Sequence, residues 1–189
     1  MSFIDKIAAS LAPTASAEDR AEARRKAEQI AQSNDWLHKI IGHHRQIEAA
    51  FERSMNAPGS QQRLEAVREL KLVFTGHSNA EESVIYPAVI EHSSKSHATM
   101  AYEEQAAAKI NFAILENLDP MSDDWREKLE HILSAVQQHV YQEESSWFPD
   151  VAQNAPLAKQ KALTDRYTEE FERYCGGRVG QPTQMSPIT

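Results

Sequence analysis

The stretch His77-Ser-Asn-Ala-Glu81-Glu-Ser-Val-Ile-Tyr86-Pro87 decides how this chain folds, because its pattern returns 62 residues later. The second copy reads His139-Val-Tyr-Gln-Glu143-Glu-Ser-Ser-Trp-Phe148-Pro149. Residues four apart lie on one face of an α-helix, one turn above the other. Each copy therefore presents an imidazole and a carboxylate on the same side. Two such helices facing each other could surround one or two metal ions.

Both motifs lie on apolar helical stripes. Phe74 and Ile85 flank Glu81 on one stripe, and Glu143 shares a second stripe with Val136. Burying a lone carboxylate costs several kcal/mol or forces it to protonate. A single His-x-x-x-Glu usually pairs internally or with a facing Arg, but two copies in this setting favour a metal cation. Imidazole and carboxylate ligands suit iron, manganese or zinc, and two bridging carboxylates point to a dinuclear iron site.

Long helical periodicities joined by short breaks predict the fold. Apolar stripes cover residues 35–54, 61–86, 96–118 and 123–148. The break at 56–60 contains Pro and Gly, and Asp119-Pro120 ends the third helix. We therefore expect an all-α protein, an antiparallel up-down-up-down four-helix bundle over residues 35–153.

Extra segments flank this bundle. Residues 1–34 form an N-terminal helical extension, with an apolar docking segment at 2–11 and a polar, solvated helix at 17–32. Residues 154–175 are expected to form a C-terminal helix whose stripe includes Leu163, Tyr167 and Phe171. The Gly, Pro and Gln-rich tail 176–189 is expected to be flexible.

Composition narrows the functional classes. The 189 residues suit one domain with a substantial core. The net charge of −8 argues against a nucleic-acid partner. No run approaches the roughly 20 apolar residues of a membrane span, so a membrane role is not expected. No secretory signal is visible, and the lone Cys175 suits a reducing, cytoplasmic location.

The first helix of the bundle carries two adjacent histidines, of which one should face inward. The neighbours of His44 one turn away include Ile40, Ile41 and Ile47, a more apolar setting than that of His43. We therefore favour His44 as the inward residue. The aromatic residues that end each motif, Tyr86 among them, are expected to be core residues.

The pattern His44…His77-x-x-x-Glu81…His139-x-x-x-Glu143 resembles the hemerythrin-like, or HHE cation-binding, family over about residues 35–153. This resemblance implies an antiparallel four-helix bundle that holds a non-haem di-iron centre. It implies binding of dioxygen, nitric oxide or peroxide-type ligands, or sensing of iron and oxygen. By this resemblance the residues at ligand positions are His44, His77, Glu81, His139 and Glu143.

The third helix departs from the family pattern. The family usually has Glu-His about 34 residues before the last ligand histidine, whereas this chain has Glu104-Gln105. Glu104 could ligate, Gln105 could coordinate through its amide oxygen, or His97, about 12 Å along the axis, could define a displaced site. We favour Glu104, with an outer hydrogen bond from Glu104 to a ligand imidazole as the alternative. A carboxylate ligand would lower the reduction potential of the metal and favour redox chemistry over oxygen carriage.

The leading hypothesis is a cytoplasmic di-iron protein that binds a small diatomic or peroxide ligand in sensing or stress defence. Its expected metal ligands are His44, His77, Glu81, Glu104, His139 and Glu143. Manganese or zinc could replace iron. One alternative is an oxygenase or peroxidase-type enzyme. Another is an interaction or iron-delivery module whose N-terminal segment (Phe3, Ile4, Ile7 and Leu11) docks a protein partner.

Overall fold

The computed structural model describes residues 14–176, and all of its regular elements are helices. They are α2 (Ala17–Ala31), α3 (Asp35–Asn56), α4 (Ser60–Ala80), η1 (Glu81–Ile85), α5 (Tyr86–His92), α6 (Lys95–Leu115), α7 (Asp123–Gln142), η2 (Glu143–Trp147), α8 (Phe148–Asn154) and α9 (Leu157–Cys175), where η marks a π-helix. The all-α prediction is confirmed. The docking segment 2–11 and the tail beyond Gly176 lie outside the described residues.

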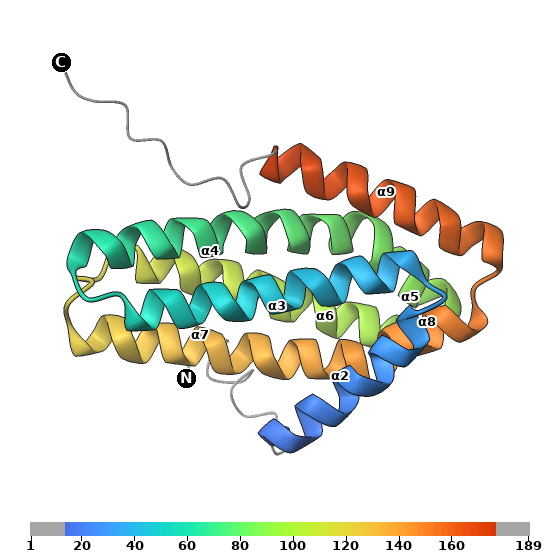
Figure 1. The fold of residues 1–189 in the computed structure, drawn as a ribbon, viewed down its shortest axis with the longest axis horizontal. Helices are drawn as coiled ribbons and strands as arrows, with labels where there is room; N and C mark the ends of the chain where they lie inside the picture. The colour runs from blue at the N-terminus through green and yellow to red at the C-terminus, as the bar shows by residue number, and fades with distance from the viewer. Residues whose placement is uncertain (1–13, 177–189) are drawn as a thin grey trace.

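Four long helices, α3, α4, α6 and α7, lie side by side, and each reverses the direction of the one before it (Figure 1). Helix α9 packs along α4 and α3 on one side of this group. Helix α2 crosses near α3, α7 and η2 at the opposite side. The two motifs therefore lie inside the molecule, with one flanking helix on each side.

The second and fourth long helices continue past the proline of each motif, so the predicted ends at residues 86 and 148 are wrong. Each passes through a π-helical turn, in which the N–H of Tyr86 donates to the Glu81 carbonyl and that of Phe148 to the Glu143 carbonyl. Proline clashes with the preceding turn of a regular α-helix. The wider π turn, with its extra residue, accommodates Pro87 at the first positions of α5.

A buried polar layer divides the core into two apolar clusters. On α3, Ile41 belongs to one cluster and Ile47 to the other, and His44 lies between them. On α4, Phe74 belongs to one cluster and Ala80 to the other, and His77 lies between them. Apolar packing on both sides holds the polar layer in place and keeps water from it.

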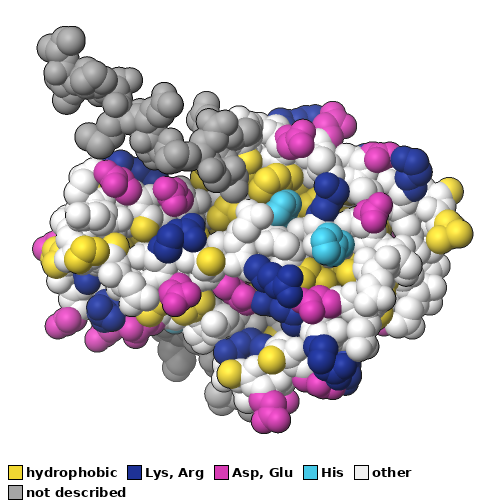
Figure 2. All heavy atoms as spheres, viewed as in Figure 1, with side chains coloured by type: hydrophobic (Ala, Val, Ile, Leu, Met, Phe, Trp, Pro, Cys, Tyr) yellow, Lys and Arg dark blue, Asp and Glu magenta, His cyan; other side chains and the backbone are white. Residues whose placement is uncertain are grey.

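Helix α2 buries more than the sequence suggested. Ala23, Ala27 and Ala31, spaced by one turn, are buried, so the expected solvated helix packs through a stripe of small side chains. Ser16 and Asp19 form a capping box at its start. On the face in Figure 2, basic and acidic side chains lie interspersed. Within residues 14–176, no helix has the length and apolarity of a membrane span.

Candidate metal centre

Four buried side chains converge at the middle of the polar layer. His44 comes from α3, His77 from α4, and Glu81 and Glu143 from the first residues of the two π segments. One donor atom from each lies within 4.8 Å of the others, and none of these residues exceeds 2% exposure. Three separate parts of the chain thus bring their donors to one point.

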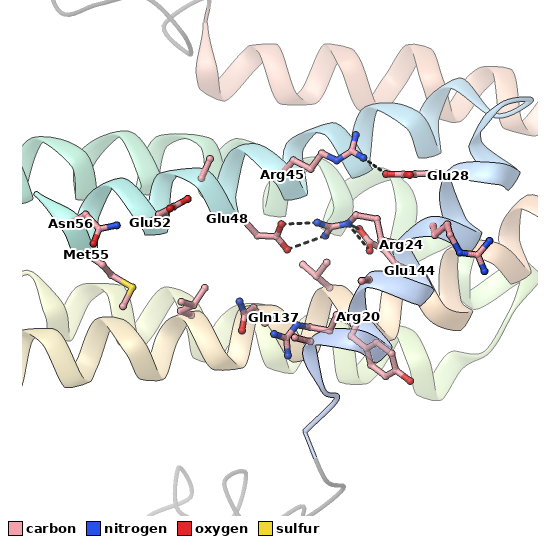
Figure 3. A pocket seen from close by; sticks show the side chains of 17 residues that line it. Arg20, Arg24, Glu28, Arg45, Glu48, Glu52, Met55, Asn56, Gln137 and Glu144 are labelled. Atoms are coloured by element: carbon pink, nitrogen blue, oxygen red, sulfur yellow. Dashed lines mark hydrogen bonds and ion pairs between the residues drawn. The ribbon is translucent and has the colours of Figure 1, made fainter.

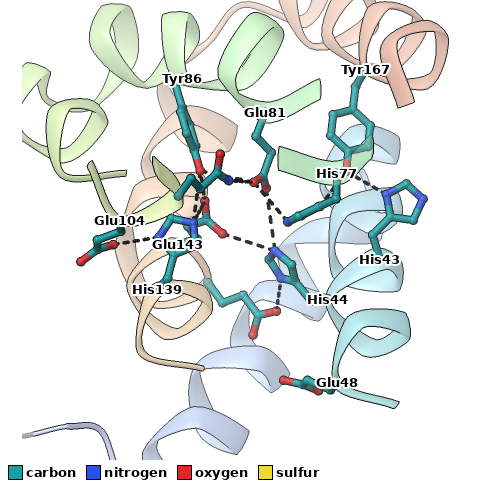
Figure 4. A network of polar contacts seen from close by, with 12 residues as sticks. His43, His44, Glu48, His77, Glu81, Tyr86, Glu104, His139, Glu143 and Tyr167 are labelled. Carbon is teal, nitrogen blue, oxygen red and sulfur yellow. Dashed lines mark hydrogen bonds and ion pairs between the residues drawn. The ribbon is translucent and has the colours of Figure 1, made fainter. Parts of the chain in front are cut away.

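The imidazole Nε2 atoms face the two carboxylates (Figure 4). His44 Nε2 lies 3.3 Å from Glu143 Oε2 and 3.8 Å from Glu81 Oε1. His77 Nε2 lies 3.1 Å from Glu81 Oε2. His139 Nε2 lies 3.2 Å from Glu143 Oε1. Glu143 therefore lies between His44 and His139, which places two histidines on one side of the carboxylate pair and one on the other.

Several of these inward atoms have no hydrogen-bond partner within the described part of the chain. They are His44 Nε2, Glu81 Oε1 and Glu143 Oε2. A buried polar atom without a partner costs about 1–3 kcal/mol, so native proteins rarely leave several together. A cation among these atoms would engage their lone pairs at once. The donor set of imidazole nitrogens and carboxylate oxygens fits iron, manganese or zinc.

The outward nitrogen of each imidazole, Nδ1, has a partner on another segment. The pairs are His44 with Glu144 (2.8 Å), His77 with Tyr167 (3.0 Å) and His139 with Glu104 (2.8 Å). Such partners hold the proton on Nδ1 and leave the Nε2 lone pair free for a metal. This arrangement is typical of histidines that ligate metals.

The third-helix residues divide their roles. Glu104 lies on the Nδ1 side of His139 and not among the inward donor atoms. This position matches the alternative considered for Glu104, an outer hydrogen bond to a ligand imidazole. Gln105 takes the inward position, where its Nε2 donates to Glu81 Oε2 at 2.7 Å while its Oε1 has no partner among residues 14–176. His97 lies elsewhere, with its ring stacked on Trp147 at 5.6 Å and its Nδ1 3.1 Å from Ser93 Oγ.

The two adjacent histidines of α3 also differ in position. His44 is fully buried and faces the carboxylates, as favoured from its apolar neighbours. His43 is partly buried, and its Nδ1 lies 2.8 Å from the Tyr167 hydroxyl. Burial and the nearby charge of His44 lower the pKa of His43 to about 4.

Tyr86, expected to be a core residue, belongs to the polar layer. Its hydroxyl donates to Glu143 Oε1 at 3.0 Å and lies 3.2 Å from His139 Nε2 and 3.3 Å from Glu81 Oε2. In an α-helix, a residue five positions after Glu81 points well away from it. The π turn brings the two to the same face, and no sequence pattern marks that turn.

Glu144 and Tyr167 are further residues of the site that the sequence did not predict. Glu144 is 2% exposed and accepts hydrogen bonds from Arg24 of α2. Tyr167 belongs to α9, 90 residues after the histidine that it contacts. Only the Glu-Glu pair in each motif hinted at a role for Glu144, while contacts between distant helices leave no trace in helical periodicity.

The charged groups of the cluster shift one another's pKa values in opposite directions. Burial and the charge of Glu143 raise the pKa of Glu81 to about 7. Burial also acts to raise the pKa of Glu143, but His139 and His44 outweigh it and lower that pKa. Burial opposes a charged His139, yet Glu143 and Glu104 raise its pKa to about 10. A metal cation would take the place of protons on these groups.

Comparisons with known proteins found a family match and a relative. The model of the hemerythrin HHE cation binding domain family matches residues 35–151. A protein named DNA nickase from a Nostoc strain is 24% identical over 129 residues, which cover 68% of this chain. The match covers 36% of that relative, so the chain spans about a third of its length. No solved structure matches the chain.

The family match covers α3 through most of α8 and thus includes every inward donor of the cluster. The family is described as cation-binding, which agrees with the unpartnered nitrogen and oxygen atoms. Helices α2 and α9 lie outside the matched range. The chain belongs to the hemerythrin HHE cation-binding domain family.

Proposed function

We propose that this chain is a non-haem di-iron protein that binds a small oxidant, such as dioxygen, nitric oxide or peroxide, in sensing or stress defence. One observation carries the proposal. Buried imidazole and carboxylate atoms converge without hydrogen-bond partners in a domain whose family binds cations. A cytoplasmic location remains part of the proposal.

The geometry suggests how the donors would be shared. Glu81 and Glu143 would contribute to both metal positions, and His44 and His77 to one of them. His139 would serve the other, near the Gln105 amide and the Tyr86 hydroxyl. Iron held by such ligands supplies reversible binding and electron transfer to small oxidants.

The protein's own residues set the conditions for this chemistry. The apolar clusters on both sides exclude water from the layer. His139 is 5% exposed and its partner Glu104 is only partly buried, so the α6–α7 side offers one approach to the layer. The Tyr86 hydroxyl lies 3.2 Å from His139 Nε2 on this side and would offer a hydrogen bond to a small ligand there.

Metal analysis of the purified full-length chain, reconstituted with ferrous iron without oxygen, tests the proposal. We expect about two irons per chain and an optical spectrum that changes when nitric oxide or peroxide is added. His44→Ala should lose both, whereas His38→Ala, an exposed histidine on the same helix, should lose neither. Fewer than one tightly held metal per wild-type chain would contradict the proposal, and zinc or manganese in place of iron would revise the metal.

The name of the Nostoc relative supports a second candidate, metal-dependent nicking of DNA. Paired metal ions held by carboxylates can cleave phosphodiesters. The net charge of −8 weighs against DNA binding, and the absence of a nucleic-acid partner stays a prediction. Incubation of supercoiled plasmid with the iron- or manganese-loaded protein discriminates. Nicking that His44→Ala abolishes would favour this candidate, and intact plasmid would reject it.

A further inference from the structure

A tyrosine from outside the family domain reaches the metal layer. Tyr167 lies on α9, beyond the matched residues 35–151, and its side chain is fully buried. Its hydroxyl lies 3.0 Å from His77 Nδ1 and 2.8 Å from His43 Nδ1 (Figure 4). It is thus a single polar group between an inward histidine and an outward one.

The direction of these hydrogen bonds follows from the proposed metal site. If His77 offers its Nε2 lone pair to a metal, its proton lies on Nδ1. The Tyr167 oxygen then accepts that proton in a hydrogen bond, and the Tyr167 O–H donates to His43 Nδ1. Each of these two hydrogen bonds then has one donor and one acceptor.

We propose that Tyr167 is a positioning residue of the metal centre, which holds the His77 ring with Nε2 toward the carboxylates. The proposal rests on the metal site of the proposed function. It makes α9 part of the centre, although the family domain ends before this helix begins.

The packing around Tyr167 suits a positioning role. Its ring stacks on His43 with centroids 5.6 Å apart, and His43 stacks on Phe171 at 3.7 Å. Gly76, directly before His77, faces Cys175 of α9, whose sulfur leaves no room for a Cβ. The glycine therefore lets α9 approach α4 closely beside the metal histidine.

The outer end of this hydrogen-bonded chain reaches the surface. His43 and Tyr167 line a cavity of about 230 Å³ together with Lys39 and Glu172. The His77 ring is therefore held from a point where α3, α4 and α9 meet. A substitution that removes the Tyr167 hydroxyl should therefore act on the metal through His77.

Zinc affinity of the full-length chain, measured by competition with a chelator, tests the proposal without relying on redox activity. Loss of an outer hydrogen-bond partner typically weakens metal binding by about 10–100-fold. We expect this loss for Tyr167→Phe, which keeps the ring and removes the hydroxyl. Tyr174→Phe, an exposed tyrosine on the same helix, should bind zinc as the wild type does.

Nitrogen-15 NMR of the zinc-loaded proteins separates positioning from general damage. The His77 Nδ1–H should give a slowly exchanging signal in the wild type that Tyr167→Phe loses while helix content is unchanged. His43→Leu should weaken zinc binding by a smaller factor and add nothing in the Tyr167→Phe background. If Tyr167→Phe does not fold, His43→Leu alone carries the test.

Wild-type zinc affinity and an intact Nδ1–H signal in Tyr167→Phe would overturn the proposal. Unchanged affinity in His43→Leu, where that variant carries the test, would overturn it equally. Failure of the wild type itself to bind zinc or iron would instead reject the metal site of the proposed function.

Discussion

At the scale of single residues, burial and mutual charge shift the pKa values of the groups in the cluster. Its two inward carboxylates have opposite pKa shifts, upward for Glu81 and downward for Glu143. Burial acts to raise both pKa values, but His139 and His44 outweigh it for Glu143, while the charge of Glu143 adds to it for Glu81. Metal binding should therefore release protons from the protein.

Without metal, the stability of the protein should fall as pH rises from about 6.5 to about 10, because of His139. Burial opposes its charged form, but Glu143 and Glu104 raise its folded-state pKa to about 10. A raised folded-state pKa contributes stability below the unfolded-state value, and this contribution is lost as pH rises through the folded-state value. Urea unfolding in EDTA at several pH values measures the effect. His139→Gln should flatten the slope, and an unchanged slope would contradict this account.

Replacing Gln105 by histidine should strengthen the proposed metal position beside His139. Gln105 is 1% exposed, and its amide donates to Glu81, so its side chain already points at the carboxylates. An imidazole there would add a neutral nitrogen ligand, and we expect the second equivalent of metal to bind about tenfold more tightly. Isothermal titration with zinc measures this change. Glu103→His, an exposed position on the same helix, is the control and should change nothing.

The sequence predicted the inward residues that interrupt an apolar stripe, such as His44 and Glu81. Burial of such polar groups without a partner costs free energy, so their position on the stripe indicates a site. The sequence favoured Glu104 over Gln105 as the third-helix ligand, whereas Gln105 is the residue that faces the carboxylates. Alanines occur one turn away from both positions, so the polarity of the neighbours does not show which one faces inward. The outer partners, such as Tyr167, depend on packing between distant helices, which periodicity in one helix does not encode.

At the scale of elements, the π segments and the flanking helices add residues to the site that the four long helices do not supply. The bundle helices were predictable from their 3.6-residue period. The π turns were not, because each depends on one extra residue within an otherwise regular helix. Helix α2 looked like a polar lead-in, yet its Arg24 lies between Glu48 and Glu144 in a groove of about 930 Å³ (Figure 3).

Arg24→Ala should destabilise the metal-free protein by about 1.5–3 kcal/mol, the usual worth of hydrogen bonds to charged groups. The arginine bonds to Glu48 at 2.6 Å and to Glu144 at 3.0 Å, and Glu144 in turn holds His44. Arg25→Ala, which removes an exposed pair with Glu22 on the same helix, should cost much less, because water screens that pair. Equal effects of the two substitutions in urea unfolding would contradict a structural role for Arg24.

At the scale of the whole molecule, the polar layer divides a core that would otherwise be continuous. The clusters around Trp36 and around Phe51 pack from its two sides, so the layer cannot move to water without opening the bundle. A cation in the layer would therefore stabilise the entire fold. The sequence predicted this arrangement in outline, because the polar residues fall at the middle of the apolar stripes.

Saturating metal should raise the unfolding free energy by about 4 kcal/mol at a free concentration 1,000 times the dissociation constant. The reason is that the folded chain alone brings the donors together. Calorimetry with and without zinc measures the shift in melting temperature. His131→Ala, at an exposed position of α7, should keep the shift, and His44→Ala should lose it. A wild type with equal stability in zinc and in EDTA would contradict this coupling.

An anomalous difference map at the iron absorption edge, from crystals of the iron-loaded full-length chain, tests the central claim most directly. We predict one peak among His44, His77, Glu81 and Glu143 and a second on the His139 side of the carboxylates. A map with no peak in this layer, from crystals whose side chains are as ordered as their neighbours, would contradict the account.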